Sequence, residues 1–131
     1  MADFNANSPL IFEDIRFKKA LECFNSADWY PAHDAFEELW HETNGPLRNT
    51  LQAILQIAVA QLHLERGNKN GATILYGEAL GRLTKIGTPD LGVDIDRLSE
   101  CVKQRLSLLQ QNRDTQRLSL PFLFKRNLGE N

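Results

Sequence analysis

The sequence predicts an all-α fold in which about five helices form a single domain over residues 1–131. Apolar residues recur at intervals of three and four along most of the chain, which is the period of an amphipathic helix. Glycine, proline and asparagine separate these stretches. No stretch alternates between apolar and polar residues as a half-buried strand does. The length also suits one hydrophobic core, because domains most often contain roughly 100–150 residues.

The first two helices are expected over residues 12–25 and 29–44. The first has apolar residues of mixed period. The second is marked more clearly, since Asp28 is a suitable N-cap and Pro31 falls in the first turn, where its missing N–H is not needed. An apolar stripe follows, and Gly45 supplies a left-handed C-terminal stop.

The third helix is expected over residues 47–66, opened by Pro46 and ended by Gly67. Its residues are apolar nearly all round, which is typical of a helix that is buried on most faces. We therefore expect it at the centre of the fold. The helices before and after it should complete a three-helix core of antiparallel hairpins.

The fourth and fifth helices are expected over residues 69–86 and 94–112, the latter capped by Asp94. The interior of the fourth helix contains Gly71, Gly77 and Gly81. Glycine within a helix costs roughly 0.5–1 kcal/mol relative to alanine. Three such residues therefore predict that another backbone packs closely against this helix.

The chain becomes polar after the fifth helix and then apolar again over residues 118–124. Apolar residues at a chain end need a cover, which is either the surface of the same domain or that of another subunit. The C-terminal region, residues 94–131, is therefore expected to contain a docked tail that contributes to self-association as a homo-oligomer.

A row of polar residues lies on the facing sides of the second and third helices. The short Gly45-Pro46 break predicts that these helices form an antiparallel hairpin, and residues three or four apart share a helix face. The candidate site residues are His33, Glu37, Glu38, Arg48, Gln52, Gln56, His63 and Arg66. We expect one buried, hydrogen-bonded cluster centred on His33, Glu37, Gln52, Gln56 and His63. A buried polar group without a partner costs about 1–3 kcal/mol.

The chain resembles the small helical proteins catalogued as domain of unknown function 309, common in cyanobacteria and other prokaryotes. The resemblance covers roughly residues 10–85. It rests on Phe24-Asn25, Trp29-Tyr30, His33 with Glu37-Glu38 and Trp40, Gly45-Pro46 with Arg48, Leu51-Gln52, Gln56 with Ala58-Val59-Ala60, His63, and Arg66-Gly67-Asn68 with Gly71-Ala72. That family usually has His-Glu where this chain has His33-Asp34. The resemblance implies a multihelical fold with a three-helix core, and it implies no established activity.

Three classes of function are compatible with the polar row. The first, which we favour, is a binding or scaffold module in which the row holds the hairpin together and a surface meets an unknown protein or small ligand. The second is a metal-dependent hydrolase that uses His33, Glu37 and His63 as ligands. The third is a small-ligand pocket in which Arg48 or Arg66 meets an anionic group. Because no complete ligand set or activated nucleophile stands out, we expect no cofactor and no tightly bound metal, and enzymatic activity stays open.

Composition excludes several other classes. A net charge of −2 without a run of Lys or Arg predicts no nucleic-acid partner. No stretch approaches the roughly 18 apolar residues that cross a bilayer, so we expect no membrane association. The first residues lack the pattern of a secretory signal. Cys23 and Cys101 have no ligand-like spacing, which favours buried free thiols and a cytoplasmic location.

Overall fold

The computed structural model describes residues 13–126 and confirms the all-α prediction over this range. Between residues 13 and 126 there is no strand, and Val93 and Lys125 form an isolated β-bridge. No helix in this range has the length and apolarity needed to cross a membrane. The helices are α1 (Ile15–Asn25), α2 (Trp29–Glu42), α3 (Pro46–Glu65), α4 (Lys69–Leu83) and α5 (Ile95–Gln110).

The observed helices are shorter than predicted at several ends. α1 begins only at Ile15, because the Asp14 carboxylate accepts the Arg16 backbone N–H and so caps the helix. α4 ends at Leu83 rather than residue 86. The chain after it turns, with the Thr88 hydroxyl bonded to the Lys85 carbonyl and a left-handed glycine one residue before. In this segment after Leu83, turn hydrogen bonds form in place of the bonds that would continue α4.

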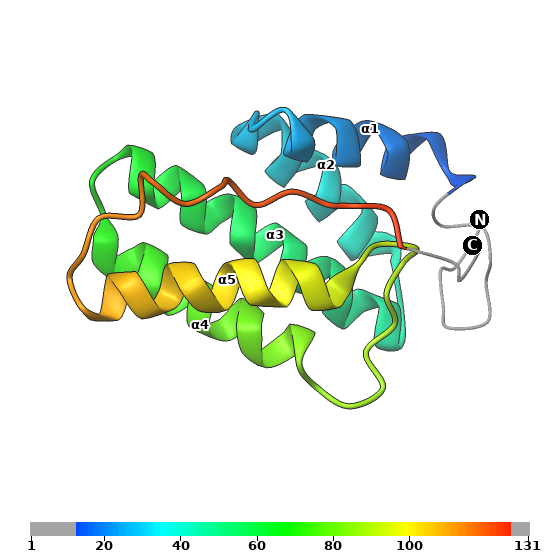
Figure 1. Ribbon diagram of the computed structural model, residues 1–131. Helices are drawn as coiled ribbons and strands as arrows, with labels where there is room; N and C mark the ends of the chain where they lie inside the picture. The colour runs from blue at the N-terminus through cyan, green and yellow to red at the C-terminus, as the bar shows by residue number, and fades with distance from the viewer. Residues whose placement is uncertain (1–12, 127–131) are drawn as a thin grey trace.

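α3 is the central helix, as predicted. It packs against α2 on one side and against α4 on the other, while α1 lies on α2 and α5 lies on α4 (Figure 1). Its buried residues include Ile54, Ile57 and Ala58, which are fully shielded from solvent. Pro46 stands in its first turn and Gly45 before it has φ of 75°, a left-handed conformation that glycine adopts without strain.

Aromatic side chains join α1 to the start of α2. The Phe24 ring meets the Trp29 ring edge-on at 5.0 Å between centroids, and it meets Phe36 in the same manner at 6.2 Å. Edge-to-face pairs contribute about 0.5–1.5 kcal/mol beyond the burial of their area. This packing fixes the rotation of α2 about its axis, so that the opposite face of the helix, which carries the polar residues, is turned toward solvent.

The close approach of another backbone, predicted for the glycines of α4, is not found at Gly71, Gly77 or Gly81, and only Gly71 has close neighbours, which are the side chains of Asn68 and His63. A Cβ added there would lie 2.7 Å from the Asn68 side-chain nitrogen, whereas one added at Gly77 or Gly81 would meet no described atom within 4 Å. The prediction was therefore wrong for all three glycines. The face of α4 that packs on the core contains Ala72, Tyr76, Ala79 and Leu83, at helical spacing, and leaves Gly77 and Gly81 on another side.

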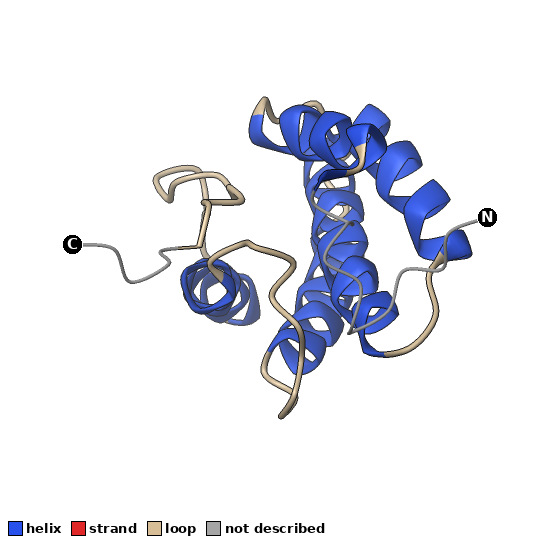
Figure 2. Ribbon diagram, turned by 90° about the vertical axis from the view of Figure 1, so that its right-hand side faces the viewer, coloured by secondary structure: helices blue, strands red, loops and turns tan. Residues whose placement is uncertain are grey.

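The C-terminal tail, which we define as residues 118–126, is docked on the domain. It runs back beside α5 toward α1, and Figure 2 shows α5 and the tail together on one side of the other helices. Its side chains alternate, with Pro121 and Leu123 buried and Leu120, Phe122 and Phe124 exposed. The predicted docking of the tail on apolar surface is therefore confirmed.

Candidate functional site

The predicted polar residues do not form one cluster between α2 and α3. The structure separates them into an α2 group around His33, an α3–α4 group around Gln56 and a turn that contains His63. The expectation of a single cluster was wrong because α3 has neighbours on two sides. Its polar residues face different partners according to where each stands around the helix.

Gln56 faces α4 and not α2. Its side-chain amide donates to Glu78 at 2.7 Å, and its oxygen accepts from the Arg82 Nε at 3.1 Å. Arg82 also donates to the Asn49 side chain at 2.8 Å. This network satisfies the buried amide of Gln56, as the sequence required, but it joins α3 to α4. Its outer member, Glu78, is exposed.

His63 lies at the turn between α3 and α4. The Asn68 side-chain amide donates to its Nδ1 at 3.0 Å, and the ring lies beside Gly71. The ligand set proposed for a hydrolase, His33 with Glu37 and His63, is therefore not brought together. The antiparallel register of α2 and α3 predicted that His33 and His63 would lie about one helical turn apart along the helix axes. The His63 side chain instead bonds Asn68, in the turn between α3 and α4.

The remaining predicted residues lie apart. Arg48 stacks over the Trp40 ring at 3.9 Å from its centroid and donates to the Thr43 carbonyl at 3.4 Å, in place of the expected neighbouring carboxylates. The side chains of Glu38, Gln52 and Arg66 make no hydrogen bond or ion pair with any residue from 13 to 126.

One compact group of potential metal ligands lies on α2. We call His33, Asp34 and Glu37 the α2 cluster. Each offers one ligand atom, and these atoms lie within 4.8 Å of one another, the only such group of three or more among residues 13–126. His33 Nδ1 is 3.1 Å from the Asp34 carboxylate, and Nε2 is 4.0 Å from the Glu37 carboxylate.

The α2 cluster is accessible to solvent. The His33 side chain is 26% exposed and that of Glu37 44% exposed. The Tyr30 ring contacts the imidazole edge-on, with centroids 6.2 Å apart. His33 and Glu37 meet because residues four apart share a helix face. Asp34 was not among the predicted residues, although it follows His33 directly and stands where the family usually has a glutamate.

The geometry of the cluster determines what it can do. Asp34 beside Nδ1 favours the tautomer that has its proton on Nδ1, which leaves the Nε2 lone pair directed toward the Glu37 side. A carboxylate that orients a histidine in this way is a frequent feature of metal sites. Imidazole nitrogen and carboxylate oxygen together suit divalent zinc, manganese, iron or cobalt. A neutral His33 is therefore arranged as one ligand of a pair.

A second polar cluster, entirely buried, was not predicted. The Tyr76 hydroxyl donates to the Gln61 side-chain oxygen, and the Arg105 guanidinium donates to the same oxygen at 3.2 Å. Arg105 is only 2% exposed. Burial raises the pKa of Tyr76 well above its usual value, and the positive charge of Arg105 opposes that rise. Tyr76 therefore acts as a neutral hydrogen-bond donor.

A signal for Arg105 was present in the sequence. It lies three residues after Val102 and four before Leu109, so it shares the apolar face of α5 with them. A charged residue on the apolar face of a helix either extends its charged group to solvent at the border of that face or binds hydrogen-bond acceptors from another element. Here the acceptors come from α3 and from the tail, which no local pattern indicates.

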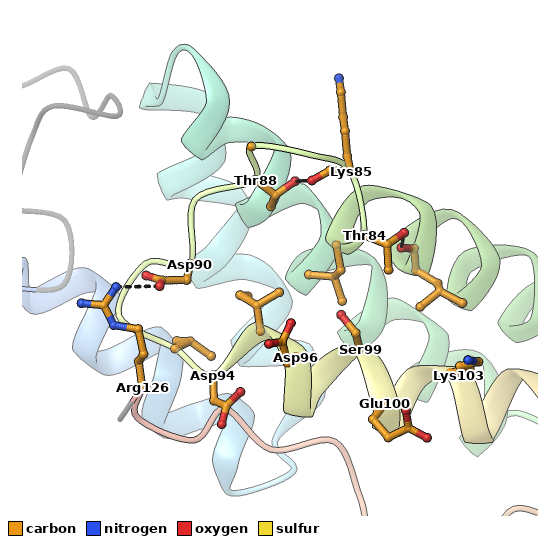
Figure 3. A pocket seen from close by; sticks show the side chains of 15 residues that line it. Thr84, Lys85, Thr88, Asp90, Asp94, Asp96, Ser99, Glu100, Lys103 and Arg126 are labelled. Atoms are coloured by element: carbon orange, nitrogen blue, oxygen red, sulfur yellow. Dashed lines mark hydrogen bonds and ion pairs between the residues drawn. The ribbon is translucent and has the colours of Figure 1, made fainter. Parts of the chain in front are cut away.

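A cleft of about 730 Å³ lies away from both clusters, between the end of α4, the following loop and the start of α5 (Figure 3). Asp90 and Arg126 pair at one edge at 2.7 Å, and Asp96, Ser99 and Glu100 line the α5 side. None of the predicted site residues lines it. Acidic residues and the cations Lys85, Lys103 and Arg126 line it together, and it is not the anion pocket that was expected around Arg48 or Arg66.

The fold and the α2 cluster define a small all-α protein with a solvent-accessible histidine and carboxylate pair on its second helix. Residues 17–75 match the sequence model of a family described as a domain of unknown function, DUF309, which confirms the resemblance predicted above. The match contains the whole α2 cluster and ends before Arg105 and the tail. No curated protein and no solved structure matches the chain.

Proposed function

We propose that this domain is a binding protein and that its α2 cluster takes a divalent metal ion between His33 and Glu37. The observation that carries this proposal is the approach of three potential ligand atoms to within 4.8 Å on an accessible helix face. His33 Nε2 and Glu37 would be the ligands. Asp34 would hold the imidazole through Nδ1.

Two protein ligands leave the remaining coordination positions to water, which the exposed face of α2 admits. Such a site binds an ion weakly and exchanges it readily, in keeping with the expectation of no tightly bound metal. The hydrolase that depended on His63 is not proposed, because that side chain is bonded to Asn68. The proposal therefore concerns binding and names no reaction.

Calorimetric titration of the full chain with zinc, cobalt and manganese tests the proposal. We expect one equivalent to bind, and we expect His33→Ala and Glu37→Gln each to weaken binding at least about tenfold. Asp34→Asn should weaken it less, since that residue only orients the imidazole. Binding should also weaken at acid pH, because a protonated imidazole cannot bind a metal.

His41→Ala and His63→Ala are the matched controls, since both remove a histidine outside the α2 cluster. Each should leave the affinity unchanged. Equal losses from the control variants and from His33→Ala would contradict the proposal, because they would indicate general adsorption of the ion to histidines. No measurable binding in the unmodified chain would contradict it as well.

Self-association through the tail is a second proposal, favoured by the row of outward side chains. Leu120 is 51% exposed, and the rings of Phe122 and Phe124 lie 4.6 Å apart beside it. Leu120, Phe122 and Phe124 are two residues apart along the chain, so this row of outward apolar side chains is centred on Phe122. A two-fold axis there would place Leu120 of one copy against Phe124 of another, which is how a self-complementary interface forms.

Sedimentation velocity over a range of protein concentrations tests this second proposal. Phe122→Ser should shift the chain toward monomer. Ile86→Ser is the control, because Ile86 is a fully exposed apolar residue on the loop after α4. Identical sedimentation of the Phe122→Ser variant and the unmodified chain would contradict it.

Location and further partners stay predictions. We propose a cytoplasmic location, which the two free cysteines support, since Cys23 and Cys101 are half-buried and unpaired with each other. The lack of a nucleic-acid partner is proposed on the charge balance alone. Labelling in cells and a filter-binding assay, respectively, would test these two statements.

A further inference from the structure

A cavity of about 480 Å³ lies where α1, the loop before α5 and the C-terminal tail meet. This volume is within the range of roughly 300–1,000 Å³ that small-molecule sites occupy. The buried residues that line it are all apolar, and each is only 2–3% exposed: Phe17, Leu91, Val93 and Leu123. The cavity shares no residue with the α2 cluster, and none of the predicted site residues lines it.

Hydrogen bonds between backbone groups fix two of the cavity's walls to each other. The Asp94 N–H donates to the Phe124 carbonyl at 2.8 Å. The Arg126 N–H donates to the Gly92 carbonyl at the same distance. The Arg126 guanidinium also pairs with the Asp90 carboxylate at 2.7 Å (Figure 3). Loop and tail therefore form one continuous wall, and a ligand would meet a preformed cavity, as is usual for small-molecule sites.

The loop wall contains a strained residue. Leu91 has φ of 58°, in the left-handed region that a bulky side chain rarely adopts. In this conformation its side chain is buried and lines the cavity. Backbone strain persists only where the surrounding structure holds it, and such positions are frequent at ligand sites. The strain at Leu91 is thus located in the apolar lining of the cavity.

The charged residues of the lining are all exposed, so they stand at the mouth of the cavity: Glu13, Lys18, Lys125 and Arg126. The ammonium groups of Lys18 and Lys125 form no hydrogen bond or ion pair with any residue from 13 to 126. Even when Arg126 is counted as neutralised by Asp90, two ammonium groups stand with the single carboxylate of Glu13. The lining residues therefore give the mouth a positive charge.

We propose that this cavity binds a free carboxylate with an acyl chain, its chain against Phe17, Leu91 and Leu123 and its carboxylate beside Lys18 and Lys125. An apolar interior with charged groups at its opening selects a ligand that is apolar at one end and charged at the other. A ligand with many hydroxyl groups would leave them unpaired against the apolar lining, which is costly. The proposal depends neither on the α2 cluster nor on self-association through the tail.

Calorimetric titration of the full chain with hexanoate, octanoate and decanoate, below the concentrations at which they form micelles, tests the proposal. We expect one equivalent to bind. The affinity should rise up to about fourfold for each added methylene that enters the cavity. Decylamine, which reverses the charge of the head group, should bind at least about fivefold more weakly than decanoate. In nuclear magnetic resonance spectra, decanoate should shift the amide signals of Leu91, Gly92 and Leu123.

Variants at the mouth test the recognition of charge. Lys18→Ala and Lys125→Ala should each weaken decanoate binding about two- to fivefold, as expected for exposed ion pairs. Lys85→Ala and Lys103→Ala are the matched controls, because both remove an exposed lysine that lines the separate cleft between α4 and α5. Each control should leave the affinity unchanged. Equal losses from all four variants would overturn the proposal.

A variant that fills the cavity tests the recognition of the chain. Leu21 is half-buried and lines the cavity, so Leu21→Trp should occupy the space and weaken decanoate binding at least about tenfold. Ile74→Trp, at a position of α4 that is 62% exposed, is the control for an added indole. Circular dichroism verifies that each variant retains its helices.

Equal affinities for decanoate and decylamine would overturn the proposal, because the mouth would then not select by charge. Amide shifts confined to residues away from the cavity would overturn it too. So would the absence of binding at every chain length, which is the result expected if residues 9–12, the segment before Glu13, occupied the cavity themselves. Binding to phosphatidylglycerol vesicles without binding to free decanoate would assign the positive mouth to a membrane surface instead.

Discussion

Asn25 and Leu123 stand 98 residues apart in the chain and exchange two hydrogen bonds, one through each half of the asparagine amide. Asn25 is the last residue of α1, so its side chain projects past the helix end toward the tail. The carbonyl and N–H of Leu123, both partly buried, find their partners in this one side chain. The pair joins the two ends of the described chain.

The first prediction concerns this pair. Asn25→Ala should lower the free energy of unfolding by about 1–3 kcal/mol, because both Leu123 groups lose their partner. Urea denaturation measures the loss, and hydrogen exchange should show an opened Leu123 amide. Asn70→Ala, at an exposed position of α4, should change stability by less than about 0.5 kcal/mol. Equal effects of the two substitutions would contradict the role assigned to Asn25.

The second prediction concerns Arg105. Arg105→Ala removes one of the two donors to the Gln61 oxygen, leaves the Leu118 and Ser119 carbonyls without the Arg105 donor and opens a cavity, so it should cost about 3 kcal/mol or more. Arg97→Ala is the control, since Arg97 is exposed and stacks on the Phe124 ring, a contact worth about 1 kcal/mol or less. Urea denaturation of both variants distinguishes a buried anchor from a surface contact.

Cys101 gives this second prediction an independent readout. Burial raises the pKa of its thiol, and the nearby Arg105 charge opposes that rise. At neutral pH the thiol should therefore react with iodoacetamide more slowly than an exposed cysteine does. Because its sulfur lies 4.0 Å from the Ser119 carbonyl of the tail, release of the tail should speed the reaction. Loss of the Arg105 charge alone would slow the reaction, because that charge lowers the pKa of the thiol. Faster labelling in Arg105→Ala, measured in a Cys23→Ser background, would therefore indicate a released tail, and slower labelling would contradict this readout.

The third prediction compares Glu37 with Gln56. If Glu37 lay in the single buried cluster that the sequence predicted, Glu37→Ala would leave its partners unpaired and cost about 1–3 kcal/mol. The structure changes this expectation, because Glu37 is half-exposed and only 4.0 Å from one partly exposed histidine. We expect less than about 1 kcal/mol for Glu37→Ala and about 1–3 kcal/mol for Gln56→Ala. Thermal unfolding of both variants, without added metal, measures the order of the two effects. The reverse order would contradict the assignment.

The fourth prediction concerns acid stability. The hydrogen bond from the Arg16 side chain holds the pKa of Asp14 below its usual value of 3.8. A carboxylate whose pKa is lowered by folding contributes stability above the unfolded pKa and loses it as the pH falls through the folded pKa. Asp14→Asn should therefore be less stable than the unmodified chain at neutral pH, by about 1 kcal/mol or less after solvent screening. The difference should shrink as the pH falls below 3.8 and vanish once the pH lies below the lowered pKa of Asp14 in the folded chain. A difference that stays constant across this range would exclude the charge as its cause.

The sequence by itself determined the helices and the contacts within one turn of each. Asp28 and Pro46 act on their immediate neighbours, so the N-cap position of α2 and the first-turn proline of α3 could be placed without knowledge of the fold. For the same reason His33 and Glu37 could be paired. Their spacing of four residues fixes their proximity as soon as α2 forms. The Asp28 side chain makes no capping hydrogen bond, however, and the predicted left-handed stop was wrong, because α2 ends at an extended Thr43 and Gly45 is the N-cap residue of α3.

Tertiary structure alone decided which faces of different helices meet. The contact of Gln56 with Glu78 rather than Glu37 depends on the rotation of α3 between two neighbours, and a periodic apolar pattern on all sides of α3 does not define that rotation. The joining of Asn25 to Leu123 and of Arg105 to Gln61 depends on the path of the tail across the domain. Hydrogen bonds between residues so far apart form only where the packed core brings their elements together, so no local pattern contains them.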